Sequence, residues 1–239
     1  MDLDILSKYN QWNSELEEKY LKLWPEAEYH IWDGVISPND YFRSPLKILF
    51  LNKEAYDTEY DSYDISEALK EELELSKPIF NNRPIKYNFK NRLFVLKLIS
   101  NLNQSYLTDD VYNQYSNEEF YHDMLKTAYC NIKKSDGKGK SNSQDLRYCF
   151  LRNKEIIEEQ ISFLNPSLII GGNVVDGIIE DGVNGFLCKQ DDEEDLANVI
   201  RKITNLPKEK LNEISRNAQK TALDYTDSKV AARYLAEIS

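Results

Sequence analysis

The order of apolar segments constrains the fold of this chain most strongly. Three short apolar runs, each bounded by polar residues, are typical of buried strands: residues 47–51, 127–132 and 167–170. Apolar residues at helical spacing occupy much of the remaining chain, over residues 4–23, 64–76, 87–102 and 144–164. Strands that alternate with helices favour a parallel sheet. We therefore expect an α/β protein with a mainly parallel central sheet flanked by helices.

The chain changes character after residue 171. Residues 178–187, IIEDGVNGFL, predict a turn and a short strand, and three helical patterns follow, over residues 196–203, 211–222 and 228–238. We expect an α/β domain over residues 1–172. Residues 173–239 would add a strand and helices packed on the same domain.

Composition limits the partners and the compartment. The net charge of -11 counts against a general nucleic-acid binder, but it leaves room for a compact site with a local basic rim. The 3 cysteines have no CxxC spacing, so the chain carries no zinc signature and fits a reducing compartment. Neither a signal peptide nor an apolar run of ~20 residues is visible. We expect a cytoplasmic monomer without metal, cofactor or membrane contact.

Polar residues follow the first two expected strands. In open parallel sheets, ligands bind at the carboxyl ends of the strands, here residues 52–57 and 131–134. The Glu54 carboxylate can polarise a water or stabilise a developing cation, or it is an ordinary loop acid. The Asn131 amide can donate and accept together, as the reading of a nucleobase edge requires, or it caps its own loop.

A cluster of lysines lies beside Asn131. Its members are Lys133, Lys134, Lys138 and Lys140, with Gly137 and Gly139 between them. Such a loop can bind phosphate, and it can equally be a solvated surface loop. The glycines do not have the spacing of a Walker loop.

These strand-end segments resemble the uracil-DNA glycosylase superfamily over roughly residues 30–172. KILFLNKEAYD, residues 47–57, is similar to the strand and water-activating motif written GQDPYH in one branch of that family. In this alignment Asn52 stands for the Gly, Lys53 for the Gln and Glu54 for the Asp. Tyr56 matches the Tyr, and Asp57 replaces the His. AYCNIKK, residues 128–134, resembles the strand that ends in the base-reading Asn.

The resemblance implies a mechanism and a set of site residues. The target nucleotide would flip into a pocket. Asn131 would bind the base, and Glu54 would position water and stabilise the oxocarbenium-like sugar. Tyr56 would form a wall of the pocket, and Lys133 and Lys134 would contact flanking phosphates. The resemblance thus implies a DNA glycosylase that excises a damaged or modified pyrimidine. Relatives that act in antiviral defence suggest a hypermodified phage-type base.

Two features of the sequence leave other functions open. The family's His-Pro-Ser segment is absent, because no histidine follows His122. A catalytically inactive module that binds nucleic acid or nucleotide is therefore the first alternative. The second comes from the tail: residues 171–239 resemble the end of retaining GT-B glycosyltransferases, which suggests a remnant of a sugar-nucleotide enzyme.

Overall fold

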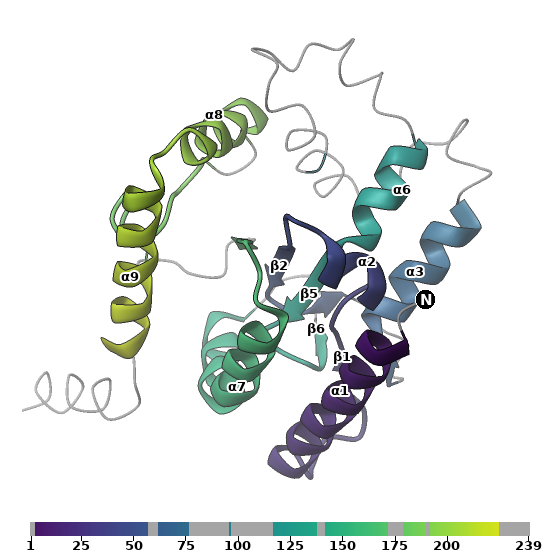
Figure 1. Ribbon diagram of the computed structural model, residues 1–239. Helices are drawn as coiled ribbons and strands as arrows, with labels where there is room; N and C mark the ends of the chain where they lie inside the picture. Colours follow the sequence, from purple (N-terminus) through teal and green to yellow (C-terminus); the bar gives the residue numbers. More distant parts are fainter. Residues whose placement is uncertain are drawn as a thin grey trace, which may run out of the picture. The chain divides into compact units, whose positions relative to one another are not determined.

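The computed structural model describes residues 3–56, 62–76, 96, 117–137, 142–171, 179–189 and 192–224 (Figure 1). The chain divides into two compact units. The first lies within residues 1–90 and 113–174, and the second within residues 91–112 and 175–239. The expected packing of residues 173–239 on the first domain stays a prediction.

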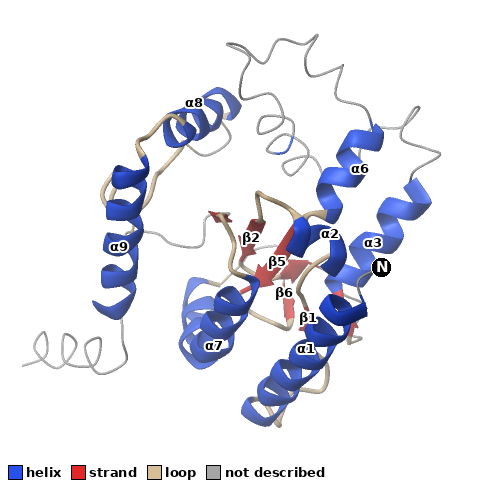
Figure 2. Ribbon diagram, viewed as in Figure 1, coloured by secondary structure: helices blue, strands red, loops and turns tan. Residues whose placement is uncertain are grey.

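The first unit is built on a parallel three-stranded sheet with the order β5-β2-β7. The strands are β2 (Ile48–Asn52), β5 (Thr127–Asn131) and β7 (Leu168–Gly171). The register pairs Ile48 of β2 with Thr127 of β5 and with Leu168 of β7. The described strands are flanked by helices (Figure 2). The α/β class with parallel strands, expected from the apolar runs, is confirmed.

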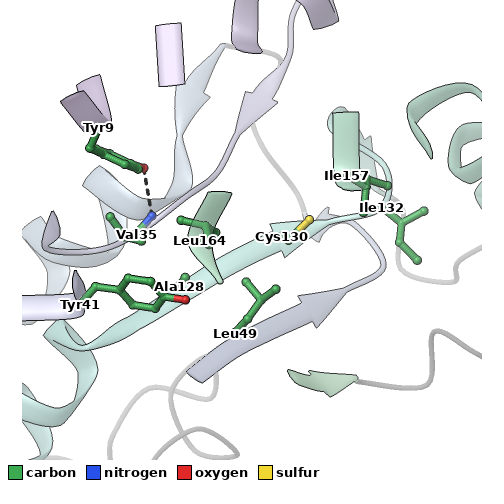
Figure 3. Packing of buried hydrophobic residues seen from close by; sticks show 9 residues of the cluster. All are labelled: Tyr9, Val35, Tyr41, Leu49, Ala128, Cys130, Ile132, Ile157 and Leu164. Carbon is green, nitrogen blue, oxygen red and sulfur yellow. Dashed lines mark hydrogen bonds between the residues drawn. The ribbon is translucent and has the colours of Figure 1, made fainter. Parts of the chain in front are cut away.

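One face of the sheet packs against three helices: α1 (Leu3–Leu23), α2 (Pro38–Arg43) and α7 (Ser143–Leu164). The buried cluster between them draws on the sheet and on all three helices, with Tyr9, Val35, Tyr41, Leu49, Ala128, Cys130, Ile132, Ile157 and Leu164 as its members (Figure 3). Side chains alternate across a strand, so Ala128 and Cys130 face this cluster while Tyr129 and Asn131 face the opposite side.

A segment from Ile31 to Ile36 lies against the other edge of β5 and runs antiparallel to it. The Tyr129 backbone N–H donates to the Gly34 carbonyl at 2.7 Å, and Val35 forms an antiparallel bridge with Ala128. Within this segment, β1 (Ile31–Trp32) pairs in parallel with β4 (Tyr63–Asp64). This antiparallel neighbour was not expected, because the apolar run at 31–36 is interrupted by a charged residue and a glycine.

The remaining described elements of the first unit are α3 (Ile65–Ser76), α6 (Asn117–Leu125) and a short parallel pair, β3 (Ala55–Tyr56) with β6 (Asp136–Gly137). The helices expected at 4–23, 64–76 and 144–164 are confirmed as α1, α3 and α7. The helix expected over 87–102 lies outside the described residues, apart from Leu96, which is helical and buried.

The second unit contains α8 (Glu193–Thr204) and α9 (Lys208–Asp224), where two helices were expected. The short strand expected in residues 178–187 is reduced, in the described part, to an isolated bridge between Asp181 and Gly185 around a turn. Gly182 has a positive φ of 73° in this turn, a conformation that favours glycine. The last expected helix, residues 228–238, lies outside the described residues.

Candidate functional site at the strand ends

The carboxyl ends of β2 and β5 lie side by side. Asn52 and Asn131 are register partners, and the ladder continues beyond them. The Ile132 backbone N–H donates to the Asn52 carbonyl at 3.0 Å, and the Lys133 N–H donates to the Lys53 carbonyl at 2.9 Å. The two loops selected from the sequence are therefore adjacent in space.

Glu54 is held between two pairs of strands. On its amino side β2 pairs with β5, and on its carboxyl side Ala55 of β3 pairs with Asp136 of β6. Ala55 is only 5% exposed. With backbone pairing on both sides, the position of Glu54 relative to the end of β5 is fixed by the fold rather than by a free loop.

The Glu54 carboxylate belongs to a line of charges. Its Oε2 lies 3.5 Å from the Lys133 Nζ, which also donates to the Asp145 Oδ2 at 2.8 Å. The side chains of Glu54 and Lys133 are mostly buried, with exposed fractions of 7% and 16%, while that of Asp145 is half-exposed. Asp145 reaches this place from the first turn of α7, where the Asn142 side chain caps the helix.

These charges change the proton affinity of their neighbours. Burial lowers the pKa of Lys133, but the hydrogen bond and charge of Asp145 and the charge of Glu54 outweigh it, so the net pKa is raised. Burial, with the nearby Asp145 carboxylate, raises the pKa of the Cys149 thiol to about 11. At neutral pH Lys133 is therefore positively charged, and Cys149 is a protonated, unreactive thiol.

Two polar atoms at this site are buried without a partner. The Glu54 Oε1 and the Asn131 Nδ2 have no hydrogen bond within the described part of the chain, and Asn131 is 2% exposed. A buried polar group without a partner is costly, and native structures keep few of them. The site thus offers one free acceptor and one free donor, on residues placed by adjacent strand ends.

The placement of Lys134 corrects the sequence prediction. Its side chain is 0% exposed, and its Nζ donates to the Asp33 Oδ1 at 2.7 Å and to the Gln160 Oε1 at 3.0 Å. A phosphate cannot reach a buried ammonium that is already paired. In this structure Lys134 is a structural cation, whereas phosphate contact by Lys133 stays a prediction.

The other predicted site residues are only partly placed. The Asn52 side chain donates from Nδ2 to the Phe50 carbonyl at 3.3 Å, and Lys53 is partly buried. For Tyr56 only the backbone is described, as part of β3. Asp57, together with Lys138 and Lys140 of the lysine cluster, lies outside the described residues.

Three residues of this region were missed from the sequence: Asp33, Asp145 and Gln160. A signal existed for two of them. Asp33 interrupts an apolar segment, and Gln160 lies on the apolar face of α7 between Ile156 and Leu164. Polar residues in such positions are usually hydrogen-bonded to one another in the folded protein.

The described residues contain no group of three histidine, cysteine or acidic side chains that could hold a metal ion. None of the helices that the structure describes is long and apolar enough to cross a membrane.

Comparison of the chain with protein-family models, with curated proteins and with solved structures finds no match.

Proposed function

We propose that this protein is a DNA glycosylase that hydrolyses the N-glycosidic bond of a damaged or modified pyrimidine. One observation carries the proposal: the buried, unpartnered Oε1 of Glu54 and Nδ2 of Asn131 lie on residues at neighbouring strand ends. A free carboxylate oxygen accepts a proton from water, and a free amide N–H donates to a base carbonyl. Both atoms match what hydrolysis of a nucleoside requires.

In the proposed reaction, Glu54 orients a water toward the sugar carbon that carries the base. The bond between that carbon and the base nitrogen breaks, and its electron pair leaves with the base. The Asn131 amide stabilises the negative charge that develops on a base carbonyl oxygen. Water oxygen forms the new bond to the sugar, and its proton passes to Glu54 and then to the departing base.

Lys133 supports Glu54 and takes no covalent part. Its ammonium offsets the charge that the carboxylate carries in a mostly buried position. Because its pKa is raised, an uncharged amine that could attack the sugar is scarce at neutral pH. The proposed enzyme therefore releases the base and leaves the strand intact at the abasic site.

A binding module of the same fold is the second candidate. The net charge of -11 and the burial of Lys134 both reduce the attraction of phosphates. A module of this kind would use the Asn131 amide to bind a base without breaking its bond to the sugar.

Base release from a panel of DNA substrates separates the two. The panel holds uracil, hydroxymethylated and glucosylated pyrimidines and unmodified DNA, in single- and double-stranded form. We expect release of a free base from at least one modified substrate, with strand scission only after alkali. Asn131→Ala should slow release by ~100-fold, the size of effect seen when one preorganised donor is removed. Retention of a modified strand without release from any member would instead support the binding module.

A further inference from the structure

Asp33 lies directly behind the candidate site. This acid sits on the segment antiparallel to β5, and its side chain is completely buried. Its Oδ2 accepts a hydrogen bond from the backbone N–H of Asn131 at 2.7 Å. The residue that presents the free amide is thus held through its backbone by a buried carboxylate.

The second oxygen of the same carboxylate has other partners. The Asp33 Oδ1 accepts from the Lys134 Nζ and from the Gln160 Nε2, both at 2.7 Å. The Gln160 Oε1 in turn accepts from the Lys134 Nζ at 3.0 Å and from the Cys130 thiol at 3.3 Å. The Lys134 Nζ also lies 4.9 Å from the centre of the Trp32 ring.

This network fixes the carboxylate from several directions. A buried charge is tolerated only when its hydrogen-bonding capacity is met, and here both oxygens of Asp33 are used. Side chains alternate along β5, so Cys130 points into the network while the Asn131 side chain points away from it. The network therefore lies on the face of β5 opposite to the Asn131 side chain and contacts this residue through its backbone.

We propose that Asp33 is a positioning residue, which sets the orientation of the Asn131 side chain through the bond from its Oδ2 to the Asn131 backbone. Lys134 and Gln160 act one step further back, by holding the carboxylate in place. The functional meaning rests on the proposed function, but the positioning of Asn131 can be measured without a substrate.

Two double variants separate the hydrogen bond from the ion pair. The first combines Asp33→Asn with Lys134→Met and is called the Asn/Met variant. It removes both charges but keeps a side-chain oxygen that can accept from the Asn131 N–H. The second combines Asp33→Leu with Lys134→Met and is called the Leu/Met variant. It removes the charges and the acceptor together. Neither leaves a lone buried charge, which the single variants would do and which would lower Tm by about 10 °C.

For base release, we expect the Asn/Met variant to lie within about 3-fold of wild type, because the acceptor is kept. The Leu/Met variant should lower kcat by ~10–100-fold with KM for DNA unchanged, since small misplacements of a reacting group have effects of this size. In an Asn131→Ala background the difference between the two should vanish. Leu164→Ala, a buried core change away from the Asp33 bonds, controls for lost stability alone.

The substrate-free arm uses NMR of the Asn131 amides. In wild type the backbone amide should exchange slowly and resonate downfield, as a charge-assisted bond requires. The side-chain amide of Asn131, assigned by its loss in Asn131→Asp, should keep its shift in the Asn/Met variant and move in the Leu/Met variant.

The outcomes are distinct. If the two double variants released base at the same rate and had the same Asn131 side-chain amide shift, the positioning role would be overturned. This holds whether both resembled wild type or both differed from it, because the acceptor would then make no difference. Rapid exchange of the wild-type Asn131 backbone amide would overturn it even if the Leu/Met variant failed to fold. If wild type released no base from any DNA, the proposed function would fail, while the NMR arm would still decide the role of Asp33.

Discussion

At the scale of single residues, three acids of the first unit differ in their hydrogen-bond partners. Asp33 is bonded at both oxygens, Glu54 has one free oxygen, and Asp64 accepts from the backbone N–H groups of Ser66 at 2.7 Å and Glu67 at 3.3 Å. Local partners, rather than burial alone, distinguish a structural acid from one available to a ligand.

Asp64 should make stability depend on pH. Burial raises its pKa from 3.8 to about 6; the Ser66 hydrogen bond opposes this, and the Asp33 charge adds to it. Because the folded state binds the proton more tightly, stability falls as pH rises from about 4 to about 6. Asp64→Asn keeps the capping oxygen and removes the buried charge. At pH 7.5 it should raise the unfolding free energy by at most about 3 kcal/mol, at ~1.4 per pKa unit.

Denaturant unfolding at pH 4 and pH 7.5 measures this difference. The gain should fall to about 0.5 kcal/mol at pH 4, where the acid is protonated in the folded state and partly protonated in the unfolded state. Asp192→Asn is the matched control, because Asp192 caps α8 through the Asp195 N–H and its side chain is 39% exposed. A gain of the same size at both pH values would show that the Asp64 charge is not the cause.

At the scale of elements, α7 links the core to the site. Its buried face packs against the sheet through Ile157 and Leu164, and it also supplies Asp145 to Lys133 and Gln160 to Asp33. The helix begins at a clear signal: the Asn142 side chain accepts from the N–H groups of Gln144 at 2.9 Å and Asp145 at 3.3 Å.

Loss of this cap should weaken the protein measurably. Asn142→Ala leaves two N–H groups of the first turn without their acceptor and should cost about 1 kcal/mol, seen as a fall in Tm of ~2–4 °C. Asn142→Asp keeps the acceptor and should stay close to wild type. Thermal unfolding followed by circular dichroism measures both. Equal Tm values for the alanine and aspartate variants would contradict the capping role.

The long elements could be predicted from the sequence, and the small ones could not. The helices α1 and α7 and the strands β2 and β5 follow from strong apolar periodicity or short buried runs. The pair β3 and β6 has two residues in each strand and depends on contact between distant loops. No local pattern encodes such a pair, although it is what holds Glu54 in place.

At the scale of the whole molecule, the candidate site was partly predictable. Parallel strands bring their carboxyl ends together, so the proximity of the loops at Glu54 and Asn131 followed from strand order alone. The positions of the two lysine side chains could not be predicted in this way. Lys133 and Lys134 are neighbours in sequence, yet one reaches Glu54 and the other is buried against Asp33, because successive side chains of an extended chain point to opposite faces.

At the net charge of -11, the long-range electrostatic interaction of the whole molecule with DNA is repulsive. A glycosylase of this kind must gain its selectivity from the flipped base and its pocket rather than from phosphates. The proposed function therefore depends on the chemistry of Glu54 and Asn131.

Single-turnover base release by Glu54→Gln measures the contribution of this carboxylate. The substrate is whichever panel member wild type acts on, and Glu155→Gln, on an exposed position of α7, is the matched control. We predict that Glu54→Gln slows release by ~100- to 10,000-fold, as for loss of a general base, while the control keeps the wild-type rate. Release by Glu54→Gln at the rate of the control would contradict the proposed role of Glu54 and, with it, the assignment of this site.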